Sequence, residues 1–158
     1  MFSQTAEYAL RSMVWLALTP ESLVPTTDLA RATRVPAHYL AKVLQQLAAA
    51  GIINGRRGVG GGYQLARPAR NITLREIVVA VMPLDRITAC PLGIPCENLC
   101  DLHHLMDSLT AEVLRVLETR TLADLAESRG RGVPLCGAAL DGHNGHGAAL
   151  TIDRLPAN

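Results

Sequence analysis

One short stretch constrains the fold of this 158-residue chain more than any other, the run Gly55-Arg56-Arg57-Gly58-Val59-Gly60-Gly61-Gly62. Short segments that contain β-branched, aromatic or other apolar residues, 52–54 and 63–65, flank it, which predicts two β-strands joined by a tight turn. Glycine-rich loops also bind nucleotides, but a P-loop ends in Gly-Lys-Ser/Thr and a dinucleotide fingerprint leads into a helix, and this run does neither. The run therefore predicts a β-hairpin with a basic tip, where glycine lets the backbone approach phosphates closely.

Three helices are predicted ahead of this hairpin. Helical spacing of apolar residues indicates a helix over residues 5–18. Thr26 or Thr27 is expected to cap a helix over 28–33, and Pro36 to open one over 36–50 that Gly51 ends. The last two form a helix-turn-helix, whose second helix is the recognition helix. That helix is expected to bury Leu40, Val43, Leu44 and Leu47 and to present His38, Tyr39, Lys42 and Gln46.

The charge distribution supports a nucleic-acid-binding face. Residues 31–75 hold eight Lys or Arg and no Asp or Glu, so this segment carries +8 although the whole chain carries only +1. Such a block is the electrostatic footprint of a surface that binds nucleic acid, and the alternative is a solvated basic surface. With the hairpin as a wing, Arg56 or Arg57 is expected to enter the minor groove of double-stranded DNA.

The remaining chain divides into four predicted parts. A capping box, Thr73 to Glu76, starts a helix to about residue 82 that closes a winged domain over residues 1–82. Residues 83–101 form an irregular loop with Cys90, Cys96 and Cys100. Residues 102–127 hold a long helix to about residue 118 and a last turn capped by Thr121; residues 128–158, which include Cys136, are expected to be disordered. The predicted fold class is mainly α with a small β-wing, a winged helix-turn-helix domain plus a long dimerisation helix.

The long helix predicts a homodimer. Its apolar residues step by three or four and have no remaining element of their own chain to cover them, so a partner subunit is the natural cover. These residues are Leu102, Leu105, Leu109, Val113 and Val116.

Composition and motifs limit the cellular compartment and the kinds of chemistry that are expected of the chain. The chain shows no secretory signal and no apolar run of roughly 20 residues, so it is expected to be cytoplasmic, with no membrane association. Clustered cysteines in a reducing compartment more often bind metal or serve redox chemistry than form structural disulfides. No Ser/His/Asp set and no paired carboxylates are present, so no enzymatic activity is expected.

Several motifs carry a family resemblance. The segments concerned are Glu7-Tyr8-Ala9-Leu10-Arg11, the wing from Arg57 to Tyr63, Ile72-Thr73-Leu74-Arg75-Glu76-Ile77, the cysteine loop, and Thr121-Leu122-Ala123-Asp124-Leu125. Over roughly residues 1–127 the chain resembles the Rrf-type family of bacterial winged-helix transcription regulators, of the IscR- and NsrR-like kind that sense through an iron–sulfur cluster.

The resemblance implies a cluster, 2Fe–2S or 4Fe–4S, held by Cys90, Cys96 and Cys100 and a fourth ligand. The cysteine intervals of five and three residues differ from the five and five usual in the family, and Cys96 is the ligand this departure affects most. Two residues compete for the fourth position: His103, in a Cys-x-x-His pattern, and Glu7 from the other subunit. Each has an alternative, because Glu7 is also placed to pair with Arg11 four residues on and His103 can be an exposed helix-start residue.

The sequence thus predicts a dimeric DNA-binding transcription regulator whose iron–sulfur cluster senses redox state, nitric oxide or iron–sulfur supply. The alternative is a cluster-free thiol- or zinc-dependent DNA-binding regulator of the same fold, since zinc accepts a Cys3His set equally well.

Overall fold

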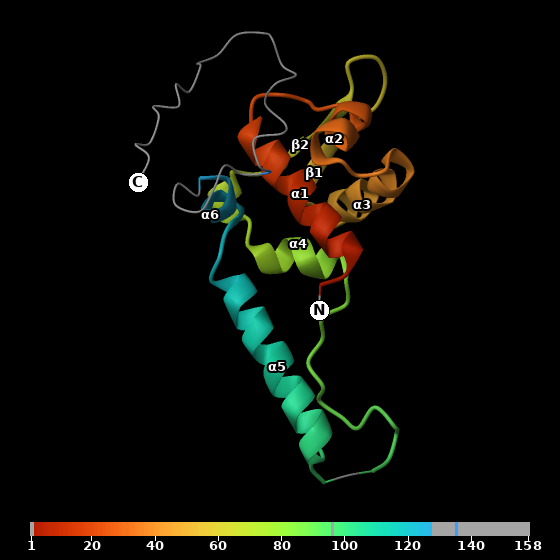
Figure 1. Ribbon diagram of the computed structural model, residues 1–158, viewed down its shortest axis with the longest axis vertical. Coiled ribbons are helices and arrows are strands. Elements are labelled where there is room, and N and C mark those ends of the chain that lie inside the picture. Colours follow the sequence, from red (N-terminus) through yellow and green to blue (C-terminus); the bar gives the residue numbers. More distant parts are fainter. Residues whose placement is uncertain (1, 96, 128–134, 136–158) are drawn as a thin grey trace, which may run out of the picture.

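The computed structural model describes residues 2–95, 97–127 and 135. It is mainly helical with one small antiparallel sheet, so the predicted fold class is confirmed. A body holds most of the elements, and a single long helix projects from it as an arm (Figure 1). The elements in chain order are α1 (Gln4–Leu18), α2 (Thr26–Thr33), α3 (Ala37–Ala49), β1 (Ile53–Arg56), β2 (Gly62–Leu65), a 3₁₀ turn η1 (Ala69–Asn71), α4 (Leu74–Val81), α5 (Asp101–Glu118) and α6 (Leu122–Ala126).

Helix α1 forms the centre of the body. It begins after Ser3, whose hydroxyl accepts a hydrogen bond from the N–H of Ala6 at 3.2 Å, which satisfies one free donor of the first turn. Its apolar face, including Met13 and Leu16, is fully buried against α2, α3, α4 and α6. This arrangement lets one helix support both helices of the helix-turn-helix.

Helix α2 begins earlier than the sequence predicted, and neither threonine caps it. Pro25 is the N-cap residue, and its carbonyl accepts the N–H groups of Asp28 and Leu29 at 3.1 and 2.9 Å. Thr26 and Thr27 are therefore the first two helical residues. The physical reason is that Pro25, with φ −59° and ψ 145°, has the non-helical backbone typical of an N-cap residue, so its carbonyl accepts the first helical hydrogen bonds without a side-chain cap.

Helix α3 matches its prediction closely. Leu40, Val43, Leu44 and Leu47 are all fully buried, as expected. Pro36 is the N-cap rather than the first helical residue. At the other end Gly51 adopts a φ of +69°, and the N–H of Ile52 reaches the carbonyl of Leu47 at 3.1 Å, which is a Schellman ending.

The wing is an antiparallel hairpin in the predicted place. Strands β1 and β2 pair in the register Ile53 with Leu65 and Gly55 with Tyr63. Val24, ahead of α2, joins this sheet because it exchanges two main-chain hydrogen bonds of 2.9 Å with Tyr63. A Cβ on Gly62 would come within 2.5 Å of the Val24 backbone, so only glycine permits this third chain to approach.

Helices α4 and α6 close the body. Thr73 and Glu76 form the predicted capping box of α4, and Thr121 forms a second one with Asp124 at the start of α6. The N–H of Leu122 donates to the carbonyl of Ile72 at 2.8 Å, and an antiparallel bridge joins Thr73 to Thr121. The chain thus returns to the body after α5.

Helix α5 differs from the others because it buries so little. Leu117 is its one buried residue, and Leu102 and Leu109 are 62% and 61% exposed. Of the apolar stripe expected to be left uncovered, Leu102, Leu105, Leu109 and Val116 are exposed in the single chain, whereas Val113 packs partly against the core of the body. No helix among the described residues is long and apolar enough to cross a membrane. The expected disorder of residues 128–158 concerns residues that, apart from 135, lie outside the described structure.

Candidate nucleic-acid interface and cysteine loop

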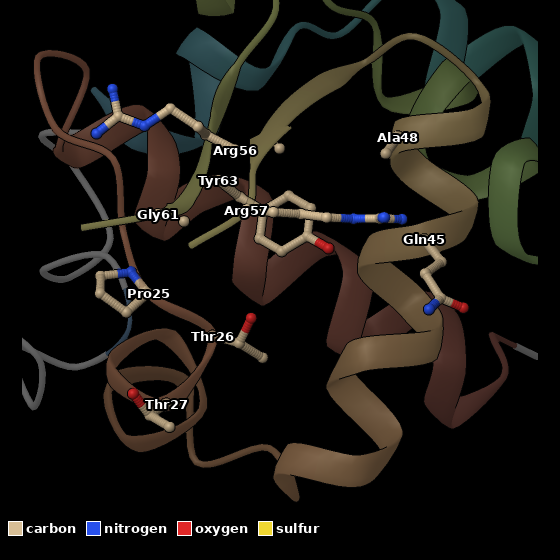
Figure 2. A pocket seen from close by; sticks show the side chains of 11 residues that line it. Pro25, Thr26, Thr27, Gln45, Ala48, Arg56, Arg57, Gly61 and Tyr63 are labelled. Atoms are coloured by element: carbon tan, nitrogen blue, oxygen red, sulfur yellow. The ribbon is translucent and has the colours of Figure 1, made fainter. Parts of the chain in front are cut away.

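The start of α2, the C-terminal half of α3 and the wing enclose a groove of about 580 Å³ (Figure 2). Several polar and basic side chains line it, and none of the lining residues is acidic. The groove therefore offers hydrogen-bond donors in a positive field, which suits a polyanion. Its lining residues are Pro25, Thr26, Thr27, Gln45, Ala48, Gly55, Arg56, Arg57, Gly61, Gly62 and Tyr63.

The two wing arginines play different parts. The guanidinium of Arg56 donates to the carbonyl of Gly60 at 3.1 Å, which braces the hairpin turn. Arg57 makes no hydrogen bond or ion pair with the described part of the chain, and in Figure 2 its side chain extends across the groove toward α3. Arg57 is the wing arginine with its hydrogen-bonding groups available to an external partner.

Two of the residues that the sequence predicted on the recognition helix lie on its flank beside α1. Tyr39 turns toward α1, where its hydroxyl lies 3.3 Å from the Thr5 hydroxyl and its ring packs edge-on against Tyr8 at 5.7 Å. Lys42 is exposed and borders a small cavity of about 130 Å³ on the same flank. His38 is exposed near the start of the helix. Tyr39 and Lys42 therefore lie beside α1 and away from the wing.

Sequence reasoning missed that the helix-turn-helix contributes polar side chains to the groove. Gln45 is exposed and lines the groove, and Thr26, expected only as a possible cap, lines it as well. Gln46, which was expected to point outward, is half-buried, and its Oε1 has no partner among the described residues. The signal that could have found Gln45 is its spacing from Ala41 and Ala48, which places all three on one helical face.

The cysteine loop is only partly described. Cys90 is half-buried and Cys100 is exposed, while Cys96 lies outside the described residues. Cys100 is the N-cap residue of α5, and its Sγ lies 3.4 Å from Nδ1 of His103. The structure thus brings together two of the predicted ligand residues, a thiol and an imidazole, at the start of the arm.

An ion pair fixes the stem of this loop to α5. Arg86 donates twice to the carboxylate of Asp107, at 2.6 Å each, and the N–H of Ile87 donates to the same carboxylate at 2.8 Å. The hydrogen bonds from Arg86, then the bond from Ile87, lower the pKa of Asp107 to about 2. Sequence reasoning missed this clamp, because the two charged residues are 21 positions apart.

Glu7 lies in the body and is paired there. Its carboxylate forms an ion pair with Arg11, which also donates to the Thr33 carbonyl at 3.5 Å and lies over the Tyr8 ring. In Figure 1, α1 is part of the body, whereas α5 begins at the far end of the arm. Among the described residues no three His, Cys, Asp or Glu side chains gather to hold a metal ion. Within the described residues of one chain, Glu7 and the pair Cys100 and His103 therefore stand apart.

Comparisons with known proteins agree with this architecture. The family model Rrf2, described as iron-dependent transcriptional regulator, matches residues 2–128. A Mycobacterium tuberculosis protein named as an HTH-type transcriptional regulator is 36% identical over 131 residues, which cover 78% of this chain and 80% of that protein.

Two solved structures share the fold. IscR of T. potens superposes with a TM-score of 0.69 at 24% identity, covering 82% of this chain and 88% of that one. CymR, named as the global cysteine regulator of B. subtilis, superposes with a TM-score of 0.67 at 25% identity, covering 82% and 98%. The sequence-based resemblance is confirmed, and the chain belongs to the Rrf2 family of transcriptional regulators.

Proposed function

We propose that this protein is a dimeric DNA-binding regulator in which the loop of residues 83–101 holds an iron–sulfur cluster that senses redox state, nitric oxide or iron–sulfur supply. Residues 1–82 would bind DNA, and residues 102–127 would form the dimer. The observation that carries the proposal is the thiol of Cys100 at the start of α5, 3.4 Å from the His103 imidazole.

The donor set suits such a cluster. Cys90, Cys96 and Cys100 supply thiolates, the soft ligands that iron–sulfur clusters take, with His103 or Glu7 of the partner subunit as the fourth ligand. Cys100 makes no capping hydrogen bond, so its sulfur is not committed to the helix end. When bound, the cluster, 2Fe–2S or 4Fe–4S, would supply an iron centre that reacts with oxidants or small signal molecules.

The contacts of α1 offer a route from the loop to the DNA-binding surface. Tyr8 packs on Tyr39 of α3, and Arg11 reaches the Thr33 carbonyl at the end of α2. The first turns of α1 therefore touch both helices of the helix-turn-helix. If a ligand crosses from Glu7 to the partner's loop, the position of that loop acts on both helices directly, whereas a ligand at His103 acts only through packing of the arm.

DNA binding is proposed for α3 and the wing. His38 and Lys42 are exposed on α3, and Arg57 projects from the wing into an acid-free groove. Arg57→Ala is expected to weaken duplex binding strongly and to lower the salt slope by about 0.9, because one phosphate contact is lost. Arg70→Ala removes the same charge from η1, outside the groove, and serves as the matched control. Equal affinity of Arg57→Ala and the parent protein would remove this assignment.

A cluster-free thiol- or zinc-dependent regulator is the second candidate. The likeness to CymR, named as a global cysteine regulator, favours it. A Cys3His set would serve zinc equally well. Colour separates the candidates, because iron–sulfur clusters absorb visible light and zinc sites do not.

The deciding experiment is anaerobic purification followed by visible spectroscopy with iron and sulfide analysis. The parent protein and Cys136→Ala are expected to be coloured, and Cys90→Ala and Cys100→Ala colourless, with Cys96→Ala testing the ligand that the spacing leaves open. A parent protein that is colourless and contains no iron or sulfide would exclude the cluster and favour the second candidate. Loss of colour in Cys136→Ala would show that the ligand assignment is wrong.

A further inference from the structure

We infer that the groove between α2, α3 and the wing is a phosphodiester-binding site, in which Thr26, Gln45 and Tyr63 act together with Arg57 on the backbone of one DNA strand. The inference rests on the proposed DNA binding and deepens it, because it names the chemical group that the groove takes. None of Thr26, Gln45 and Tyr63 was expected to bind DNA from the sequence.

Tyr63 is held rigidly at the centre of the groove. Its main chain makes two hydrogen bonds of 2.9 Å to Val24, and its side chain lies across Gly55, its partner on β1. A Cβ at Gly55 would approach a ring carbon of Tyr63 to 2.8 Å, so a larger residue there would displace the ring. This packing fixes the ring, and in Figure 2 the hydroxyl points into the space between α2 and α3.

Several side chains in the groove have unused donor capacity. The hydroxyls of Tyr63 and Thr26, the amide of Gln45 and the guanidinium of Arg57 make no hydrogen bond with the described part of the chain. They come from α2, α3 and the wing, yet all line one groove. With no carboxylate in the lining, the matching ligand is an anion that accepts several hydrogen bonds, as the non-bridging oxygens of a phosphodiester do.

The position of the groove favours a strand of nucleic acid over a small phosphate. The recognition helix would enter the major groove and the wing the neighbouring minor groove. The backbone strand that separates two adjacent grooves must then pass between the two elements, which is where this groove lies. Its volume of about 580 Å³ also leaves room for a length of backbone rather than one phosphate ion.

The test compares Tyr63→Phe with Tyr8→Phe in the full chain, after both are shown to melt like the parent protein. Tyr8 lies on α1 outside the groove, so its substitution removes the same hydroxyl elsewhere. Affinity for a fluorescent random-sequence duplex is measured over a salt series. Tyr63→Phe is expected to bind roughly tenfold more weakly with an unchanged salt slope, because the lost hydroxyl bonds a charged group but carries no charge. Tyr8→Phe is expected to match the parent.

The outcomes distinguish a failure of the phosphodiester site from a failure of the proposed DNA binding. Should Tyr63→Phe bind the duplex like the parent while Arg57→Ala binds weakly, the phosphodiester site is wrong and DNA binding by the wing stands. Should both variants match the parent, DNA binding by this face fails as well. Inorganic phosphate and adenosine monophosphate are added as competitors; displacement of the duplex by either at low millimolar concentration would assign the groove to a free phosphate or nucleotide and overturn the inference.

Discussion

The winged body and the α5 arm bury their side chains very differently. Helix α1 buries seven of its 15 residues, whereas α5, with 18 residues, buries only Leu117. Both helices carry apolar stripes at helical spacing, so their sequences look alike. The difference teaches that the body completes its core with one chain, while the arm presents a surface that another chain must cover if it is to leave water.

The largest effect, a rise in the dimer dissociation constant, is expected when a charge is placed on the uncovered apolar surface of α5. Leu109→Asp places a carboxylate in the middle of the proposed dimer seam, where Leu109 is 61% exposed in one chain. Because burying an unpaired charge is strongly unfavourable, the dimer dissociation constant is expected to rise at least about a thousandfold. Sedimentation velocity over a concentration series measures this change.

A second variant shows whether the position or the charge is responsible. Ser108→Asp adds the same carboxylate to the polar side of α5, where the Ser108 hydroxyl only bonds the His104 carbonyl, and is expected to leave the dimer intact. A parent protein that sediments as a folded monomer would contradict the dimer and remove the contrast between body and arm.

Truncating one leucine in each region sharpens the contrast. Leu44 is fully buried in the body, so Leu44→Ala is expected to lower the free energy of unfolding by about 2–5 kcal/mol. Leu105 is 58% exposed in the single chain, so Leu105→Ala is expected to weaken dimerisation while leaving unfolding of the body near the parent value. Urea unfolding followed by Trp15 fluorescence reports on the body, because Trp15 is buried in α1. Equal destabilisation of this transition by both variants would mean that body and arm unfold as one unit.

The fold was predictable wherever local rules decide it. The capping box from Thr73 to Glu76, the glycine ending at Gly51 and the stripe of α3 each depend on residues only a few positions apart, and the structure has all three. The start of α2 was wrong by two residues, because Pro25 takes the capping position without a side-chain hydrogen bond. Propensity rules for threonine cannot detect that competition.

The candidate sites were predictable only in part. The positions of the cysteines in the sequence identified the loop, and the spacing from Cys100 to His103 already placed them at one helix start. The clamp between Arg86 and Asp107 and the inward turn of Gln46 depend on how the loop and α1 fold back onto other helices. Such contacts join residues far apart in sequence, so no spacing rule reveals them.

The identity of the fourth cluster ligand shows whether the body of one subunit binds the cluster that the arm of its partner holds. Glu7 belongs to the body and His103 to the arm, and we expect Glu7 of the partner subunit to be the ligand, so Glu7→Ala should shorten the cluster lifetime in air several-fold. Glu7→Ala also frees Arg11 from its ion pair. Arg11→Gln therefore serves as the control, since it breaks the same pair but keeps the carboxylate. Lifetime is followed by loss of visible absorbance.

The opposite result would confine the site to the arm. If His103→Ala alone shortens the lifetime and Glu7→Ala matches the parent protein, the ligand comes from the same loop and Glu7 remains an ion-pair partner of Arg11.

The smallest expected effect concerns acid stability of the loop stem compared with that of a helix cap in the body. Hydrogen bonds from Arg86 lower the pKa of Asp107 from its ordinary 3.8 to about 2, and a backbone bond from Thr121 lowers the pKa of Asp124 in the α6 cap. A carboxyl group with a depressed pKa in the folded state contributes stability that is complete above its ordinary pKa and is lost as pH falls toward the folded value. The Arg86–Asp107 clamp should therefore open between about pH 3.8 and 2. Hydrogen exchange of the Ile87 amide, which donates to Asp107, should accelerate over that range relative to an unprotected amide.

Arg86→Gln is expected to move the Asp107 pKa back toward 3.8 and leave that of Asp124 unchanged, as measured by carboxyl NMR titration. An Asp107 pKa near 3.8 in the parent protein would mean that the clamp does not hold the stem in solution, and the arm would then lack the ion pair that ties its cysteine loop to α5.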